Sequence, residues 1–442
     1  IFNPESRYAG RYLAQPGDQG ELRAVGGGFR LTEADGGVLS YRNGTLEHVE
    51  DPNGNRISCQ YAGGRLTRLS HSAGGYLDLT YNADGYIASV ADPQGRQTTY
   101  SYNGEHLTSV RTHDGRTTTY TYGTAGAAQH ALAQIGLPNG NTRSYSYDER
   151  GRLTGAWRNE GEEKLTFRLG DDGCVAITDA LGNTNRLFFD HWARLIKTEN
   201  PLGEIVHMQL DELGRLLSVT DPEGGSATYA YDQRGNVTEI TDYLRHTTRF
   251  VHAREFNRLS RVTDALYRRT DYGYDDRGNL TSVVYPDGSS EGWTRDSQGT
   301  PTSWTSRRGK VVDFEHDAVG RITRKGYADG SSAVYRYDPS GKLTEAEDAL
   351  GLTSFTYNEH ACLTRVAYPS NRWLAFTYDS IGRRTASEDQ TGHRVEYHYD
   401  ASSRLNRISS ASDDIITYTY DALGRLARQT SGNGVYADHT YD

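Results

Sequence analysis

The chain has 442 residues and a net charge of −10, and its 58 acidic residues are interleaved with 48 basic ones. Because no basic stripe is available to neutralise phosphates, a nucleic-acid partner is not expected, and because no run of about 18 apolar residues occurs, no membrane span is predicted in this segment. The 32 tyrosines favour strands and the 49 glycines favour tight turns, so the composition is typical of an all-β chain with many short strands.

Residues 1–30 lack the motif that repeats through the rest of the chain, and they contain the triplet Gly26-Gly27-Gly28. We expect this lead-in segment to be a set of strands or part of a preceding domain. The chain opens with Ile1, and its only methionine is Met208. We therefore expect it to be an internal piece of a larger polypeptide.

A repeated motif, which we call the anchor, runs through residues 31–442 and has the form Tyr-Asp-x-x-Gly-Arg-Leu. Successive anchors lie about 21 residues apart, and self-similarity at a fixed period indicates a repeat architecture. We therefore predict one continuous repeat array over 31–442. The clearest anchors begin at Tyr147, Tyr231, Tyr274, Tyr337 and Tyr420, and degenerate ones begin at Tyr41, Tyr61, Tyr81, Tyr102, Tyr122, Leu169, Phe189, Leu210, Ala253, Arg295, His316, Tyr357, Tyr378, Tyr399 and Tyr441.

A second turn signal follows half a period after each anchor, as in Asp92-Pro93-Gln94-Gly95 and Asp221-Pro222-Glu223-Gly224. In such a stretch Pro presets one torsion angle, Gly accepts a positive φ, and Asp bonds the backbone ahead of it. Each unit is therefore predicted to be strand, turn, strand, turn. The segment 226–231 alternates so that its two tyrosines share one face.

The apolar residues Leu280 and Val283 are three positions apart, so a flat strand would send them to opposite faces. Either a β-bulge intervenes, or both faces of the sheet carry apolar contacts.

A single hairpin is not stable in water, so neighbouring units must pair edge to edge, and a long twisted sheet must coil, close or split into layers. The predicted fold is all-β: tandem β-hairpin repeats wound into a spiralling hollow β-shell, here a partial shell. One insertion is expected near 123–136, where the anchor spacing lengthens. It could form a loop or a short helical turn, as a contact feature or as plain surface decoration.

No catalytic, cofactor-binding or metal-binding residue is predicted. The aspartates recur at one place in every unit, which a turn role explains, whereas a catalytic dyad should break the repeat pattern. The histidines His191, His393 and His398 replace ordinary strand or turn residues at scattered positions, so no metal site is assigned to them. The turn 51–55 lacks the pattern of a calcium site. The widely separated cysteines, which we expect to be free thiols, are Cys59, Cys174 and Cys362.

The recurring Tyr-Asp-x-x-Gly-Arg-Leu and Asp-Pro-x-Gly elements resemble those of the RHS/YD-repeat family, which includes bacterial Rhs toxins, the shell component of insecticidal Tc toxin complexes and animal teneurins. The resemblance extends from about Tyr41 onward. It implies a β-shell that encloses a chamber, which in bacterial members holds a C-terminal toxic domain. The segment 348–352 has a passing likeness to the family's release motif, but it sits in an ordinary turn and no catalytic role is transferred to it.

The function expected from this resemblance is a non-enzymatic shell segment of a bacterial Rhs-type toxin. It would be made in the cytoplasm and then secreted or delivered at the cell surface. The implied partners are the C-terminal toxin cargo of the same polypeptide and components of a secretion apparatus or toxin complex, with no cofactor. The alternative is an extracellular adhesion or carbohydrate-binding protein, because rows of tyrosines stack on sugars as well as pack within sheets.

Overall fold

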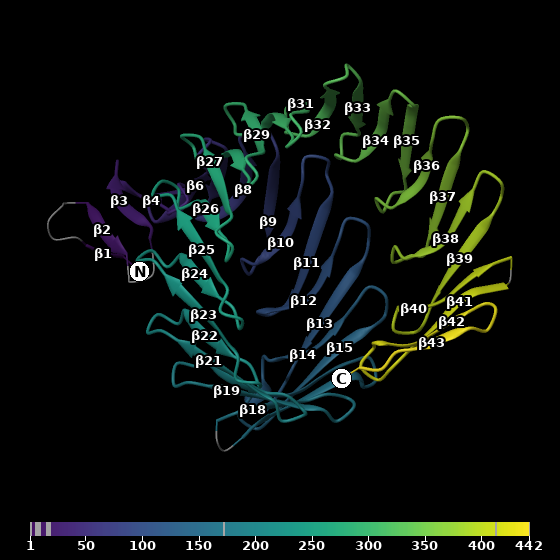
Figure 1. Cartoon of the computed structure of the whole chain (residues 1–442). Coiled ribbons are helices and arrows are strands. Elements are labelled where there is room, and N and C mark those ends of the chain that lie inside the picture. Colours follow the sequence, from purple (N-terminus) through teal and green to yellow (C-terminus); the bar gives the residue numbers. More distant parts are fainter. Residues whose placement is uncertain (1, 5–9, 15–18, 171–172, 412, 442) are drawn as a thin grey trace. The chain divides into compact units, whose positions relative to one another are not determined.

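The structure is a computed structural model that describes residues 2–4, 10–14, 19–170, 173–411 and 413–441. Part of the predicted lead-in segment, namely residues 1, 5–9 and 15–18, lies outside the described residues. Within the described part of the chain the elements are short strands, with a single 3-10 helix, η1 (Gly126–Ala128) (Figure 1). No helix in this part is long and apolar enough to cross a membrane.

The strands from the N-terminus to residue 199 are β1 (Phe2–Pro4), β2 (Arg11–Ala14), β3 (Glu21–Val25), β4 (Gly28–Thr32), β5 (Val38–Arg42), β6 (Thr45–Glu50), β7 (Arg56–Ala62), β8 (Arg65–His71), β9 (Tyr76–Tyr81), β10 (Ile87–Ala91), β11 (Gln97–Asn103), β12 (His106–Arg111), β13 (Thr117–Tyr122), β14 (Leu132–Gly136), β15 (Thr142–Tyr147), β16 (Leu153–Arg158), β17 (Glu162–Leu169), β18 (Val175–Thr178), β19 (Thr184–Phe189) and β20 (Leu195–Glu199).

The remaining strands are β21 (Ile205–Leu210), β22 (Leu216–Thr220), β23 (Ser226–Tyr231), β24 (Val237–Thr241), β25 (Thr247–His252), β26 (Leu259–Thr263), β27 (Arg269–Tyr274), β28 (Leu280–Val284), β29 (Ser290–Arg295), β30 (Pro301–Thr305), β31 (Val311–His316), β32 (Ile322–Tyr327), β33 (Ser332–Tyr337), β34 (Leu343–Asp348), β35 (Gly351–Tyr357), β36 (Leu363–Ala367), β37 (Trp373–Tyr378), β38 (Arg384–Asp389), β39 (Arg394–Tyr399), β40 (Leu405–Ser410), β41 (Asp413–Tyr420), β42 (Leu426–Ser431) and β43 (Tyr436–Asp438).

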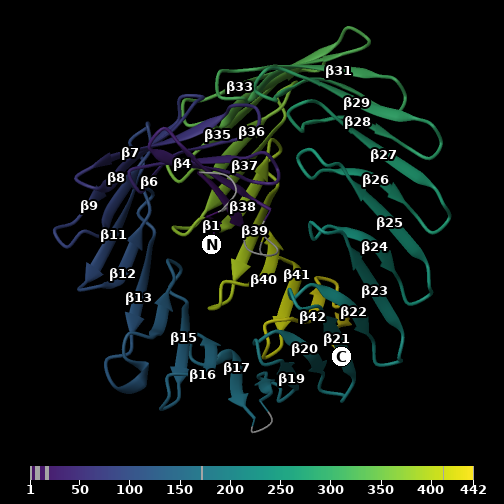
Figure 2. The same ribbon diagram turned by 90° about the vertical axis from the view of Figure 1, so that its left-hand side faces the viewer.

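Consecutive strands pair antiparallel, so the sheet is built from hairpins in chain order. Figure 2 shows this for β22 to β28, which follow one another as alternating arrows, and the register of each pair agrees. Strand β4 pairs with both β3 and β5, so the ladder also runs through residue 30. The division into a lead-in segment 1–30 and an array 31–442 stays a prediction. Within the insertion predicted near 123–136, residues 132–136 form β14, and we use the term insertion below for residues 123–131.

Both kinds of predicted turn have the same geometry. In the anchor turn at Asp148, the Gly151 N–H donates to the Asp148 carbonyl at 2.9 Å, and the Asp148 N–H donates to the Arg152 carbonyl at 2.9 Å. Gly151 has φ +76°. The Asp92 turn repeats this pattern, with Gly95 at φ +77°. A type I turn followed by a residue in the left-handed region closes a three-residue hairpin loop, and glycine adopts that region without steric penalty.

A β-bulge follows the anchor turn, and it explains how Leu280 and Val283, three positions apart, lie on the same face of the sheet. Tyr274 pairs with Leu280, but the preceding Gly273 pairs with Ser282, so Thr281 is the extra residue. The bulge shifts the alternation by one position and returns Val283, which is 6% exposed, to the face of Leu280. Of the two predicted alternatives, the bulge is therefore confirmed.

The sheet is a thin layer with little fully buried apolar surface. In β23 the side chains of Ala227, Tyr229 and Tyr231 are buried or half-buried, whereas those of Thr228 and Ala230 are exposed, so the tyrosines share one face as predicted. Among the described residues, the buried apolar side chains are those of Val38, Cys174, Ala227, Val283, Val366 and Ala386.

Contacts divide the chain into two units, each built from separated stretches of sequence, and we describe each by itself. The first comprises Ile1–Leu79, Phe189–Thr198 and Glu204–Val334, and the second comprises Thr80–Phe188, Glu199–Gly203 and Tyr335–Asp442.

In the first unit, side chains from turns that are distant in sequence form hydrogen bonds with one another. The Asn53 amide donates to Asn279 Oδ1 at 3.0 Å, and the Asn279 amide donates to Asn53 Oδ1 at 2.7 Å, across 226 residues. The neighbouring Asn55 amide donates to the Gln298 carbonyl at 3.0 Å. Amide side chains in the turns therefore join two stretches of the ribbon.

In the second unit, Ser402 likewise forms hydrogen bonds with residues that are distant in sequence. Its side chain is 1% exposed, its hydroxyl donates to Glu162, and it accepts a 3.1 Å hydrogen bond from the Asn159 amide. The Asn139 amide donates to the Ser403 hydroxyl at 2.9 Å. These polar groups lie on turns and at the start of β17, and the bonded residues are 240 to 264 positions apart in sequence.

Candidate functional site

In many units the hydroxyl of the anchor tyrosine hydrogen-bonds the backbone of the preceding unit. The Tyr231 hydroxyl donates to the backbone carbonyl of Leu216 at 2.7 Å, fifteen residues earlier. Where Arg295 replaces the tyrosine, its Nε donates to the Leu280 carbonyl at 3.2 Å instead. The other tyrosine hydroxyls that bond the preceding anchor leucine are those of Tyr61, Tyr122, Tyr147, Tyr274, Tyr357, Tyr378, Tyr420 and Tyr441.

The anchor arginine links its own turn to the tyrosine of the next unit. Arg215 pairs with Asp211 at 2.6 Å, and its guanidinium lies 4.9 Å from the centroid of the Tyr231 ring. A cation over an aromatic face is attracted by the quadrupole of the ring. The same double contact is made by Arg383, Arg404 and Arg425, over Tyr399, Tyr420 and Tyr441.

The anchor aspartates are turn acceptors. Asp148 Oδ1 accepts from the backbone N–H groups of Arg150 and Arg152, each at 2.9 Å. The Arg152 backbone N–H, followed by its side chain, lowers the pKa of Asp148 below the ordinary value. Asp114 lies instead in the half-period turn that begins at Thr112; burial raises its pKa, but hydrogen bonds from Thr112 and Arg116 outweigh burial and lower that pKa to about 2. These carboxylates stay ionised at neutral pH, so they suit the predicted turn role and not that of a general acid.

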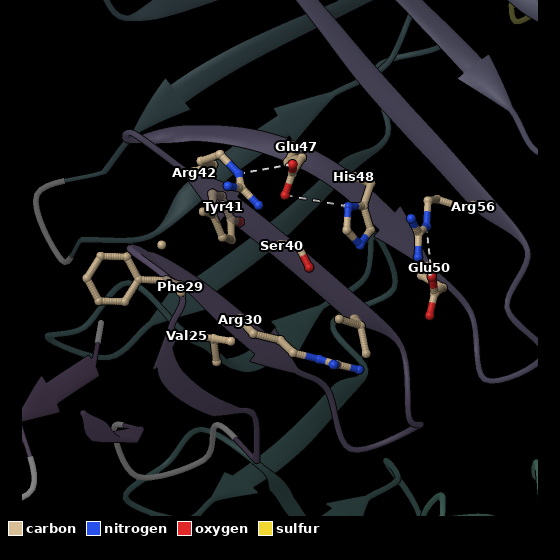
Figure 3. A pocket seen from close by; sticks show the side chains of 13 residues that line it. Val25, Phe29, Arg30, Ser40, Tyr41, Arg42, Glu47, His48, Glu50 and Arg56 are labelled. Atoms are coloured by element: carbon tan, nitrogen blue, oxygen red, sulfur yellow. Dashed lines mark hydrogen bonds and ion pairs between the residues drawn. The ribbon is translucent and has the colours of Figure 1, made fainter. Parts of the chain in front are cut away.

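A polar recess lies over β4 to β7 in the first unit (Figure 3). Its volume is about 240 Å³, and two of its arginines pair with glutamates: Arg42 Nε lies 3.1 Å from Glu47, and Arg56 Nε lies 2.8 Å from Glu50. The described hydrogen bonds do not include one between Ser40 and His48, although both line the recess. The recess therefore offers charged and hydrogen-bonding groups to solvent.

Among the described residues, none of His191, His393 and His398 belongs to a group of three or more side chains that could hold a metal ion. His398 Nε2 lies 3.0 Å from the Ser409 hydroxyl, and the His191 ring lies 3.4 Å, centroid to centroid, from that of Trp192. His393 is exposed in a turn whose backbone is bound by Asp389. No disulfide joins Cys59, Cys174 and Cys362.

One cluster of metal-ligating side chains was missed from sequence: Glu105, His106 and His130. Two of these residues interrupt one anchor, and the third lies in the insertion that interrupts the next. The cluster could have been found from the loss of the repeat pattern there, because the anchors that begin at Tyr102 and Tyr122 both lack the Asp-x-x-Gly-Arg turn.

Two tryptophans and a phenylalanine form an apolar hollow of about 570 Å³ in the first unit. Trp293 and Trp304 are direct partners in the β29–β30 ladder, and Phe314 lies on β31. Glu291, Thr300 and His316 are among the lining residues that carry polar groups. The hollow was not predicted, because its tryptophans replace strand residues without disturbing the repeat.

Comparisons with known proteins agree with the repeat pattern. The family model for the teneurin YD-shell matches residues 260–396, and the one for the RHS repeat matches 128–156 and 211–242. No curated protein matches.

Among solved structures, a crystal structure of TcdB2-TccC3 aligns with TM-score 0.50 and 14% identity, over 96% of this chain and 29% of that chain. A Tc holotoxin pore from Photorhabdus luminescens aligns with TM-score 0.48 and 12% identity, over 96% of this chain and 29% of that chain. This chain thus spans about 29% of the length of these structures. The first likeness confirms the fold class, namely β-hairpin repeats of a partial YD/RHS shell. The two family models match over the repeat array and agree with the resemblance of the anchors to the RHS/YD-repeat family.

Proposed function

We propose that this chain is a wall segment of a bacterial toxin shell, and that the shell encloses a C-terminal toxic domain of the same polypeptide until delivery. The observation that carries the proposal is how the anchor side chains are used. Tyrosine, aspartate and arginine are each bound within the sheet, so the chemistry repeated along the chain serves to build a wall. Because these repeated side chains are bound within the sheet, they also support a non-enzymatic role for the chain.

The family supports a shell, and the likeness to TcdB2-TccC3 supports the fold of one. A wall of paired strands with few exposed backbone groups could separate a cargo from the cytoplasm in which it is made. Secretion or delivery at the cell surface would then carry wall and cargo together. Components of a secretion apparatus or of a toxin complex are the further partners proposed.

The test is protease protection of the segment that follows this chain in its complete reading frame. We expect that segment to resist digestion in the native protein and to be digested rapidly after denaturation. A matched control deletes residues 221–231, which removes one strand and so disrupts the wall, and it should make the segment sensitive. Equal sensitivity in the intact and deleted proteins would overturn the proposal. Matched native and denaturing gels would show whether the segment is cleaved yet retained.

The hollow of Trp293, Trp304 and Phe314 favours carbohydrate binding as a second candidate function. An aromatic platform flanked by polar groups can stack on the apolar face of a sugar and bond its hydroxyls. A glycan array tests this: Trp304→Ala should abolish saturable, sugar-competed binding, whereas Trp192→Ala should leave it unchanged. Trp192 is a suitable control because its side chain is 62% exposed and lies outside the hollow. Absence of binding by the unmodified protein would rule out this candidate on the sugars tested.

A further inference from the structure

We propose that Glu105, His106 and His130 form a binding site for one divalent transition-metal cation, and specifically for Zn²⁺. Each offers one ligand atom, and these atoms all lie within 4.8 Å of one another. The site would fix the 123–131 insertion to the hairpin that precedes it.

The distances between ligand atoms are close to those of a zinc site. His130 Nδ1 lies 2.9 Å from His106 Nε2 and 3.3 Å from Glu105 Oε1. Around a tetrahedral Zn²⁺ with bonds of about 2.0–2.1 Å, neighbouring ligand atoms are about 3.3 Å apart. The ring centroids of His106 and His130 are 4.8 Å apart and their planes differ by 15°. With nitrogens at 2.9 Å, the rings meet edge to edge, so a small outward movement would admit an ion.

His106 occupies a position that the repeat already holds in place. It directly precedes Leu107, as the anchor arginine precedes its leucine, and like that arginine it lies against the next tyrosine. The ring centroids of His106 and Tyr122 are 4.4 Å apart, and the Tyr122 hydroxyl donates to the Leu107 carbonyl at 3.0 Å. Asn103 pairs directly with His106 across the hairpin, which places Glu105 in the tight turn between them.

The insertion holds His130 through its own backbone. The His130 N–H donates to the Gly123 carbonyl at 3.1 Å, and the Gly123 N–H donates to the Ala131 carbonyl at 2.8 Å. A Cβ at Gly123 would overlap the Ala128 carbonyl oxygen, and one at Gly151 would lie 2.6 Å from that of Ala127, so the loop packs closely on both sides. His130 itself has φ +69°, a conformation that a bulky residue adopts only where its surroundings enforce it.

The ligand types identify the class of ion. Two imidazole nitrogens and one carboxylate favour zinc, copper, nickel or cobalt over calcium and magnesium, which take oxygen ligands. Three protein ligands leave one position for water or for a group from elsewhere. The side chains of Glu105 and His130 are 67% and 54% exposed, so an ion can reach the site from solvent.

The test is Zn²⁺ titration of the untagged, chelator-treated chain, carrying Cys59→Ser, Cys174→Ser and Cys362→Ser so that no thiolate competes. We expect one equivalent to bind, and Co²⁺ to give the visible spectrum of a tetrahedral site. His106→Ala or His130→Ala should weaken binding by more than about tenfold. His113→Ala is the matched control, because it removes an exposed histidine from the next turn, between β12 and β13, and it should have no effect.

A variant that keeps the loop separates ligation from folding. Asparagine tolerates the left-handed region, so His130→Asn should preserve the backbone of the insertion while removing the imidazole. In the unmodified chain, Zn²⁺ should slow amide hydrogen exchange over 123–131, and in His130→Asn it should not. Failure of the unmodified chain to bind Zn²⁺, or an equal loss of affinity in His113→Ala, would overturn the proposal.

Discussion

The hydroxyl of Tyr231 donates a 2.7 Å hydrogen bond to the backbone carbonyl of Leu216, one repeat earlier in the chain. The residue before that leucine, Arg215, lies over the ring of the same tyrosine. The spacing of the anchor thus has a physical cause. Because Tyr231 lies one period after Arg215 and Leu216, its hydroxyl reaches the Leu216 carbonyl and its ring lies against the Arg215 guanidinium. The next residue, Asp232, begins the following anchor turn.

Removing one such hydroxyl should weaken the array measurably. Tyr231→Phe leaves the Leu216 carbonyl without its partner, and we expect the free energy of unfolding to fall by about 1 kcal/mol. Tyr229→Phe, on the same strand and face, is the control, since no hydrogen bond of its hydroxyl is described, and it should have less effect. Urea denaturation and hydrogen exchange around residue 216 would measure the difference. Equal losses in both variants would contradict the role of the hydroxyl.

The local part of this fold could be predicted from sequence, because each element is encoded within one period. The turns at Asp92 and Asp148 and the shared face of Tyr229 and Tyr231 followed from residue type and alternation. The bulge at Thr281 was left as one of two alternatives, because a spacing of three is compatible with either. The family resemblance then connected the repeats to a shell.

What could not be predicted depends on contacts between distant parts of the chain. The pairing of Asn53 with Asn279 depends on how many repeats separate two facing turns, and no local pattern encodes that number. The meeting of His106 with His130 depends on the path of an insertion without internal periodicity. The hollow around Trp293 is local, and it was not predicted because its tryptophans replace strand residues without disturbing the repeat.

Relieving a strained turn should stabilise the protein. Ala193 occupies the glycine position of its anchor and has φ +60°, whereas Gly235 occupies the same position with φ +84°. An alanine in the left-handed region costs about 1 kcal/mol relative to glycine. We expect Ala193→Gly to raise the free energy of unfolding by that amount and Gly235→Ala to lower it. Chemical denaturation of the two variants gives a matched pair, and shifts in the same direction would be inconsistent with this explanation.

The reciprocal amide pair in the first unit should show coupling. We expect Asn53→Ala and Asn279→Ala each to destabilise the protein, and the double variant to cost less than the sum by about 1 kcal/mol. The reason is that either single change already breaks both hydrogen bonds of the pair. A double-mutant cycle by urea denaturation measures this, and simple additivity would show that the contact contributes nothing.

Acid should destabilise the array through its turn aspartates. Their pKa values are lowered in the folded protein, so their contribution is complete above the unfolded value of 3.8 and is lost as pH falls through the folded value, about 2 for Asp114. We expect the urea midpoint to fall between pH 5 and pH 2. Asn358 shows that asparagine can accept the two backbone N–H groups that Asp148 accepts in its own turn, at 3.0 and 2.9 Å, and Asp114 accepts the Arg116 N–H at 3.3 Å. Replacing Asp114 and Asp148 by Asn should therefore flatten the pH dependence, and an unchanged pH profile would refute this assignment.

Deleting a whole repeat should harm the protein less than deleting half of one. Removal of residues 211–231 takes out β22 and β23 and joins Leu210 to Asp232, which preserves the Leu-Asp-x-x-Gly sequence of an anchor. Removal of 221–231 takes out β23 alone, so the number of strands changes by one. Every later anchor turn then lies at the opposite edge of the sheet, where its side chains no longer reach the leucine and arginine of the preceding anchor. Stability in a repeat array is a sum over units and their interfaces. The protein with the larger deletion should therefore have a melting temperature near that of the parent protein, and the protein with the smaller deletion should melt at a much lower temperature. Thermal melts followed by circular dichroism would decide this, and equal damage from the two deletions would show that the phase of the repeat does not govern stability.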